Sequence, residues 1–244
     1  MRKTAIITGA NRGIGRAMVE KFAENNFDIW ACARTETDEF VSDIKNLSET
    51  LGVDITPIYF NLLSEDEIKN GIKNILAEKK NIDVLINNAG VAHGGAFNMT
   101  SIKTMREIYD VNVFAQVEIM QLVTRKMMRQ ENGGCVINMC SVGGISASPG
   151  YLAYGSSKAA LIWITKMAAK ELGQYKIRVN GIAPSLVETS MGHYKSDEEM
   201  EKYFSTMALK RFATPEEIAS AAFYIASAEF MTGHILVLDG GRTA

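Results

Sequence analysis

Short apolar runs rich in β-branched residues alternate with longer helix-like segments along the 244 residues of the chain. Each run is too short for a typical helix and is bounded by turn residues, so each predicts a buried strand. The predicted strands are Lys3–Thr8, Asp28–Ala33, Ile55–Phe60, Asp83–Ile86, Cys135–Met139, Ile177–Ile182 and Ile235–Leu238. Strands that alternate with helices build parallel sheets through right-handed crossovers. The sequence therefore predicts an α/β fold: one domain over residues 1–244, with a doubly wound, seven-stranded parallel sheet and helices on both faces.

The composition is that of a globular protein with a sizeable core, because 47% of the residues are hydrophobic and 22% are charged. The formal net charge of -2 gives no general attraction to nucleic acid or to an anionic membrane. No apolar run approaches the ~20 residues of a membrane span, and the N-terminal run is too short for a signal peptide. The cysteines and histidines, three of each, show no metal-ligand spacing. We therefore expect no metal site and a reduced, cytoplasmic protein.

A glycine-rich turn joins the first predicted strand to a helical segment. Its pattern, Gly-x-x-x-Gly-x-Gly, lets the backbone come close to a diphosphate, and the helix that follows offers free N–H groups and a positive dipole. We therefore expect a Rossmann-like dinucleotide site, with an ordinary strand-to-helix turn as the alternative. The residues expected to contribute are Thr8, Gly9, Asn11, Arg12, Gly13, Ile14 and Gly15.

The residue that follows the second predicted strand bears on which dinucleotide is bound. NAD-binding proteins carry an acidic residue about twenty positions beyond the glycine turn, where it binds the ribose 2′-hydroxyl. Here that position is Arg34, followed by Thr35, and Arg12 supplies a second cation within the turn. Cations suit a 2′-phosphate, so the sequence favours NADP(H) over NAD. The alternative is that both arginines are solvated surface cations.

Tyr154 and Lys158 are four residues apart at the start of a predicted helix over Ala153–Leu172, so their side chains share one face. Lowering the pKa of a tyrosine from ~10 to ~7 requires roughly 4 kcal/mol, which a cation ~4 Å away supplies at an effective dielectric of ~20. We expect Lys158 to lower the pKa of Tyr154 in this way. Ser141 ends the fifth predicted strand and could bind the same substrate oxygen. An ordinary buried tyrosine beside a snorkelling lysine is the alternative.

These motifs together resemble the short-chain dehydrogenase/reductase family over essentially the whole chain, and its bacterial 3-oxoacyl-acyl-carrier-protein reductases most closely. The resemblance rests on the glycine turn, Asn87 to Gly90, Asn112, Ser141, Tyr154-x-x-x-Lys158 and the closing Asp239-Gly240-Gly241. It implies that Tyr154 donates a proton to a ketone oxygen that Ser141 binds. It also implies that Lys158 holds the nicotinamide ribose and that Asn112 anchors a water leading to Lys158.

The resemblance also implies further cofactor contacts beyond the glycine turn and Arg34. These are Asn61, Leu62, Asn88, Ala89, Gly90, Tyr154, Lys158, Pro184, Val187 and Thr189. It implies a homotetramer formed through two long helices, predicted at about 112–128 and 153–172. We expect a mobile lid at about 187–206, because this polar, methionine-dotted stretch is the least core-like part of the chain.

The chain departs from the family pattern at two places. Ser185 follows Pro184 where the family usually has glycine. The cations expected to dock an acidic acyl carrier protein are diluted; those present are Arg125, Lys126, Arg129, Lys176 and Arg178. Three functions follow in order of preference. They are NADPH-dependent reduction of a 3-oxoacyl thioester, oxidation or reduction of a sugar, polyol or other secondary alcohol, and NADP binding without catalysis.

Overall fold

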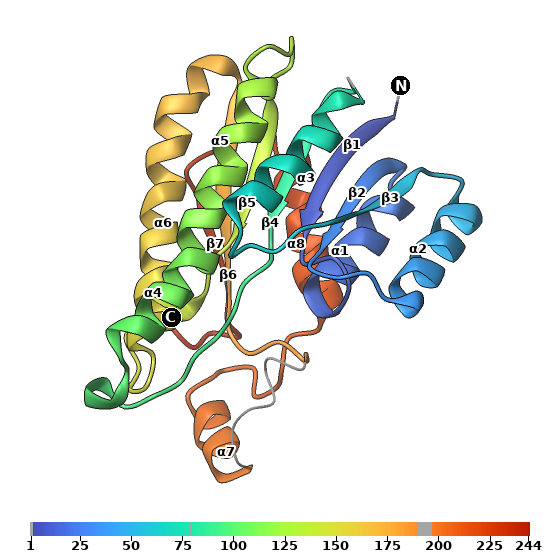
Figure 1. Ribbon diagram of the computed structural model, residues 1–244. Coiled ribbons are helices and arrows are strands. Elements are labelled where there is room, and N and C mark those ends of the chain that lie inside the picture. The colour runs from blue at the N-terminus through green and yellow to red at the C-terminus, as the bar shows by residue number, and fades with distance from the viewer. Residues whose placement is uncertain (1, 79, 190–196) are drawn as a thin grey trace.

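The computed structural model describes residues 2–78, 80–189 and 197–244. Within these residues all the strands lie in one parallel sheet in the order β3-β2-β1-β4-β5-β6-β7 (Figure 1). The strands are β1 (Lys3–Thr8), β2 (Phe27–Ala33), β3 (Ile55–Tyr59), β4 (Val84–Asn87), β5 (Gly134–Met139), β6 (Ile177–Pro184) and β7 (Ile235–Leu238). The predicted strands and their parallel arrangement are confirmed, with ends that differ by no more than two residues.

Helices cover both faces of the sheet. One face packs against α1 (Gly13–Glu24), α2 (Asp38–Leu51) and α8 (Pro215–Ser227). The other face packs against α3 (Glu65–Ala77), α5 (Ala115–Met127) and α6 (Leu152–Leu172). The side chains of β1 show the alternation, because Ile7 enters the first core and Ile6 enters the second.

Capping residues fix where several helices begin. Ser64 accepts a hydrogen bond from the backbone N–H of Glu67 at the start of α3. Thr214 and Glu217 form a reciprocal capping box at the start of α8, with Pro215 in the first turn. Both helices therefore begin at residues whose side chains stabilise a helix N-terminus.

Two further stretches of the chain contain helices. Residues 102–128, which include the long helix predicted at about 112–128, consist of α4 (Ile102–Tyr109), a π-helical turn (Asp110–Phe114) and α5. The expected lid contains a helix, α7 (Asp197–Ser205), while residues 190–196 of that stretch lie outside the described residues. In Figure 1, α7 stands apart from the sheet, at its carboxyl edge.

The strand order places a topological switch point between β1 and β4. The chain leaves β1 toward α1 on one face, and it leaves β4 toward α4 and α5 on the other. Ligands of open parallel sheets bind in the crevice that forms at such a point. Among the described residues, no helix is both long and apolar enough to cross a lipid bilayer.

Candidate active site

Thr8 joins the two turns that flank the switch point. Its Oγ1 accepts hydrogen bonds from the backbone N–H groups of Asn88 and Ala89, both at 3.0 Å. The Asn88 side chain returns two bonds, donating from Nδ2 to the carbonyl oxygens of Thr8 (3.0 Å) and Gly9 (3.3 Å). The turns after β1 and β4 are thereby held as one unit.

The glycine turn fits a diphosphate. A Cβ on Gly15 would lie 1.9 Å from the carbonyl oxygen of Gly9, so only glycine lets α1 begin so close to β1. Gly9 and Gly13 have φ of 66° and 53°, a conformation that favours glycine. Arg12, at the N-cap of α1, makes no side-chain cap hydrogen bond, so this helix start keeps its N–H groups for a ligand. Thr189 lies against Gly13 from the far side of the crevice, since a Cβ on Gly13 would be 3.0 Å from its Cγ2.

The remaining expected cofactor residues lie along the same carboxyl edge. The backbone N–H of Ala10 donates to the carbonyl oxygen of Cys32 at 3.0 Å, so the glycine turn rests against the end of β2. The exposed residues at this edge are Asn11, Arg12, Arg34 and Thr35. Of the other expected cofactor residues, Asn61 and Leu62 follow β3, Pro184 ends β6 and Val187 comes shortly after β6.

Ser141 and Tyr154 meet at the carboxyl end of β5. Ser141 begins a short turn there and its Oγ accepts a hydrogen bond from the backbone N–H of Gly143 at 3.1 Å. The Ser141 hydroxyl and the Tyr154 ring both lie next to Gly143, where a Cβ would be 3.5 Å from Ser141 Oγ and 3.8 Å from Tyr154 Cε1. Burial raises the pKa of Tyr154 above its usual 10; the neighbouring Ser141 hydroxyl lowers that pKa, and the neighbouring Cys140 and Tyr203 raise it. The phenol is therefore protonated at neutral pH and able to donate its proton.

The expectation that Lys158 lowers the pKa of Tyr154 is wrong in this structure. The ammonium Nζ lies 5.8 Å from the centroid of the Tyr154 ring and donates instead to the carbonyl oxygen of Met139 at 2.7 Å. Lys158 is fully buried, and burial lowers its pKa from 10.5 to about 8. It lies beneath Gly90, where a Cβ would be 3.5 Å from Nζ, so it faces the turn after β4 as well as the tyrosine.

Asn112 ties the π-helical turn to the loop after β4. Its Oδ1 accepts from the backbone N–H of Val91, and its Nδ2 donates to the carbonyl oxygen of the same residue, both at 2.9 Å. Nδ2 also donates to Ser157 Oγ at 3.1 Å. Gln116, which the sequence analysis did not single out, donates to the carbonyl oxygen of Ala89 at 2.8 Å. The amides of Asn112 and Gln116 therefore fix the turn that Thr8 holds from the other side.

The structure joins Ser185 to three residues that the sequence motifs did not indicate, namely Ser148, Tyr203 and Arg242. Ser148 precedes α6, Ser185 follows β6, Tyr203 lies on α7 and Arg242 follows β7. Arg242 Nη2 donates to Ser148 Oγ at 3.1 Å, and its guanidinium carbon lies 4.5 Å from the centroid of the Tyr203 ring. The hydroxyls of Tyr203 and Ser185 are 2.9 Å apart. The serine that replaces the family's glycine therefore has a bonding partner.

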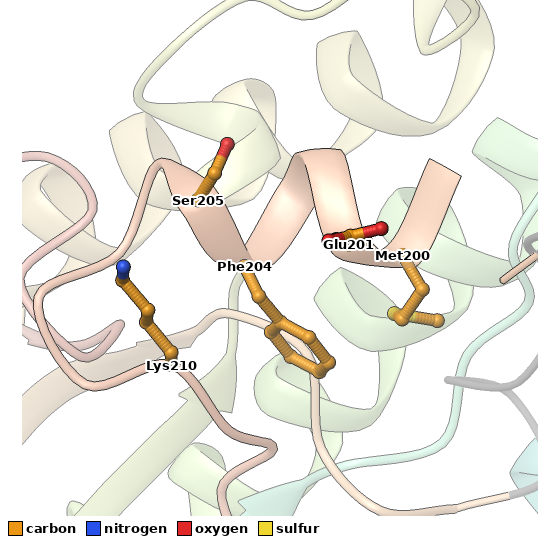
Figure 2. A pocket seen from close by; sticks show the side chains of 5 residues that line it. All are labelled: Met200, Glu201, Phe204, Ser205 and Lys210. Carbon is orange, nitrogen blue, oxygen red and sulfur yellow. The ribbon is translucent and has the colours of Figure 1, made fainter. Parts of the chain in front are cut away.

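A cavity of about 410 Å³ lies beside α7 and is separate from this group. Its lining residues are Met200, Glu201, Phe204, Ser205 and Lys210. Figure 2 shows Met200 and Phe204 extending from the same side of α7. None of the expected catalytic residues lines this cavity, so we do not assign the reacting group of a substrate to it.

The cations considered for carrier docking lie at the opposite edge of the sheet. Lys176 immediately precedes β6, and its Nζ donates to the carbonyl oxygen of Glu131 in the loop before β5. The Arg178 guanidinium donates to carbonyl oxygens at and beyond the C-terminal end of α8, including Ile225 at 2.8 Å. Parallel strands begin at this edge and end at the catalytic one, so within one chain these cations do not border the site.

The fold and site together define a nicotinamide-dependent oxidoreductase, and the chain belongs to the short-chain dehydrogenase/reductase family. Residues 9–243 match the family described as enoyl-(acyl carrier protein) reductase. The chain is 32% identical over 246 residues to the 3-oxoacyl-acyl-carrier-protein reductase FabG of Staphylococcus epidermidis, covering 99% of both chains. It is 33% identical over 241 residues to the FabG of Aquifex aeolicus, covering 98% of this chain and 96% of the relative.

Solved structures show the same fold. A short-chain type dehydrogenase/reductase from Mycobacterium marinum has a TM-score of 0.91 at 28% identity, covering 99% of this chain and 96% of the other. A 4-hydroxyisoleucine dehydrogenase complexed with NADH has a TM-score of 0.90 at 31% identity, covering 99% of this chain and 98% of the other.

Proposed function

We propose that this protein reduces a ketone to a secondary alcohol with NADPH, and that its substrate is a 3-oxoacyl thioester. The observation that carries the reaction type is that the Ser141 hydroxyl and the protonated Tyr154 lie together at the carboxyl end of β5, beside the buried Lys158. The thioester is supported by the similarity to two FabG proteins over nearly their full length.

Each catalytic residue has a task that its surroundings suit. NADPH, when bound, supplies the hydride that reduces the carbonyl carbon. Tyr154 gives its proton to the carbonyl oxygen as negative charge develops there, and the Ser141 hydroxyl donates a hydrogen bond to that oxygen. Lys158 carries a positive charge below pH 8 and lies next to Gly90, where its ammonium would hold the hydroxyls of the nicotinamide ribose. We propose that a water held near Asn112 returns the proton through Lys158.

The preference for NADPH rests on Arg12 and Arg34. Both are exposed, and they lie on two segments that are joined by the Ala10–Cys32 backbone hydrogen bond. Two cations at this edge suit the 2′-phosphate of the adenosine ribose.

A second substrate class remains a candidate because of one neighbour. The 4-hydroxyisoleucine dehydrogenase, whose name denotes a small hydroxylated substrate and whose structure holds NADH, is 31% identical to this chain. Oxidation of a polyol or another secondary alcohol would use the same Ser141, Tyr154 and Lys158 in reverse.

We propose a homotetramer and a cytoplasmic location. Trp163 on α6 and Phe114 next to α5 are 66% and 60% exposed, respectively, which is unusual for side chains of this size. Burying them against the same helices of another copy would remove that apolar surface from water. Such a copy could also bring the cations of the opposite edge near a second active site and so restore a docking surface for a carrier protein.

Initial rates of NADPH oxidation with acetoacetyl N-acetylcysteamine thioester, and of NADH oxidation in parallel, test the proposal. Turnover with a strong preference for NADPH is the expected result. Tight NADPH binding without turnover of the thioester would overturn the 3-oxoacyl assignment, and equal use of the two cofactors would overturn the role of Arg12 and Arg34.

A further inference from the structure

Arg242 holds together three segments that are far apart in the sequence. Its side chain reaches Ser148, in the loop between Ser141 and Tyr154, and stacks on Tyr203 of α7. Tyr203 in turn bonds Ser185 at the end of β6. A cation held by several segments has a defined direction, which a flexible surface arginine lacks.

No carboxylate of the described residues balances the charge of Arg242. Among the described residues, no Asp or Glu side chain lies within salt-bridge distance of its guanidinium. The nearest carboxylate in sequence, Asp239, accepts bonds from Gly241 N (2.9 Å), Thr243 N (2.8 Å) and Thr243 Oγ1 (2.6 Å). The Ser148 bond uses one of the five guanidinium N–H donors, and the structure shows no other side-chain hydrogen bond from Arg242 to a described residue.

The position of this cation relates it to the reacting group. Tyr203 lies close enough to Tyr154 to act on its phenol electrostatically, and Arg242 lies against Tyr203. The Ser148 loop leads directly into α6, which carries Tyr154, and its neighbour Gly150 accepts a 3.0 Å hydrogen bond from Gly95 in the loop after β4. The guanidinium therefore lies between the Ser148 loop and α7, two segments that adjoin Tyr154.

We propose that Arg242 is a substrate-specificity residue that binds an anionic group, a carboxylate or a phosphate, carried by the ketone substrate. The inference rests on the proposed function and deepens it. The Arg242 guanidinium would donate two parallel hydrogen bonds to two oxygens of a carboxylate or of a phosphate, and Ser148 orients it. A 3-oxo acid would supply the carboxylate itself, and a 4′-phosphopantetheine thioester would supply the phosphate from its carrier arm.

The test compares wild type with Arg242→Gln on matched ketones that differ in charge. The neutral members are ethyl acetoacetate and acetoacetyl-pantetheine, and the anionic members are acetoacetate and acetoacetyl-4′-phosphopantetheine. We expect wild type to favour one anionic member over its neutral partner. Arg242→Gln should raise the KM for that anionic ketone tenfold or more, while kcat/KM for the neutral partner changes less than twofold. The pair affected identifies the source of the charge.

Two controls separate binding from structure. Lys202→Gln removes an exposed cation from α7 next to Tyr203. This control should change neither the KM for the anionic ketone nor the kcat/KM for its neutral partner. Arg242→Lys keeps the positive charge without the planar guanidinium group. Its KM for the anionic ketone should lie between those of wild type and Arg242→Gln. An equal loss for charged and neutral ketones in Arg242→Gln would show that Arg242 only holds α7 in place, and would overturn the proposal.

A binding measurement keeps the two proposals distinguishable. Calorimetric titration of acetate and of inorganic phosphate into protein saturated with NADP+ requires no turnover. Binding of either anion by wild type and its loss in Arg242→Gln would support the anion site even if no ketone were reduced. Reduction of ketones with the same charge preference in wild type and Arg242→Gln would leave the proposed function intact and exclude Arg242 as the anion site.

Discussion

The proposed cofactor side and the proposed substrate side of this site are held in different ways. On the cofactor side, the turns after β1 and β4 are joined through Thr8 and Asn88, with glycines where the backbones touch. On the substrate side, the Ser148 loop, α7 and the segment after β7 meet through single contacts of Arg242 and Tyr203. Backbone and small residues build the first side, and long side chains build the second.

This difference assigns shared chemistry to one side and selectivity to the other. A diphosphate is the same in every dinucleotide, and fixed backbone N–H groups suffice to bind it. A long side chain that crosses between loops can be replaced without disturbing the backbone beneath it. If this division is correct, variants on one side should leave the function of the other unchanged.

Replacing Tyr154 with Phe should have the largest effect and should separate the two sides. Removing the proton donor should lower kcat by about 10²–10⁴-fold, because general acid catalysis contributes that much. The Kd for NADPH, measured by fluorescence, should change less than threefold. Tyr224→Phe, on an exposed tyrosine of α8, is the control and should match wild type. Loss of NADPH binding in Tyr154→Phe would mean that the phenol is structural and that the two sides are not independent.

A methyl group at Gly15 should damage the cofactor side. The added Cβ would lie 1.9 Å from the Gly9 carbonyl oxygen, so backbone must move. We expect Gly15→Ala to lose about 3 kcal/mol of unfolding free energy in urea titrations, together with NADPH binding. Gly173→Ala, where φ is -57° and no atom lies within 4 Å of the new Cβ, should be neutral or up to ~1 kcal/mol stabilising. Equal stability of the two variants would contradict the close packing at Gly15.

Reversing the charge of Arg34 should change which dinucleotide is used and nothing else. Arg34→Asp should lower the NADPH-to-NADH ratio of kcat/KM by tenfold or more, since an aspartate repels a 2′-phosphate and accepts from a ribose hydroxyl. Lys73→Asp, the same charge change on an exposed residue of α3, should keep the wild-type ratio. A ratio that stays unchanged in Arg34→Asp would remove this residue from cofactor selection.

The buried ammonium of Lys158 should give the smallest effect, visible as a pH dependence of stability. Its folded pKa is lowered from 10.5 to about 8, so between these values the unfolded chain holds a proton that the folded chain lacks. Unfolding free energy should therefore rise with pH in this window, by up to ~1.4 kcal/mol per pH unit from this group. In urea titrations at pH 7.5, 8.5 and 9.5, the free energy of unfolding of wild type should rise with pH relative to that of Lys158→Met. Lys166→Met, at an exposed lysine of α6, should track wild type.

Much of the fold could be predicted because its signals are local. Each strand is a short apolar run between turn residues, and the caps at Ser64 and Thr214 mark helix starts in the residues themselves. The glycine turn could be predicted for the same reason, since Gly9 and Gly15 need no distant partner to reveal their role. These features lie mostly on the cofactor side.

What sequence reasoning missed depends on contacts between distant segments. The π-helical turn at Asp110–Phe114 places Asn112 against Val91, a contact that periodicity does not encode. The spacing of Tyr154 and Lys158 on one helix face predicted that their side chains interact. The Lys158 ammonium instead donates to a carbonyl oxygen of β5, and helix geometry alone does not predict a contact with another element. Arg242 and Ser148 are 94 residues apart in sequence and meet only in the folded chain.

The place of β1 in the sheet has a consequence for how the chain folds. β1 lies between β2 and β4, and its second partner begins only at Val84. Until that segment has been synthesised, β1 can pair with β2 on one side only, and the backbone groups on its other side stay unpaired. Long-range pairing of this kind slows folding and leaves intermediates prone to aggregation. An interior strand of the finished sheet is thus an edge strand until the segment that begins at Val84 has been synthesised.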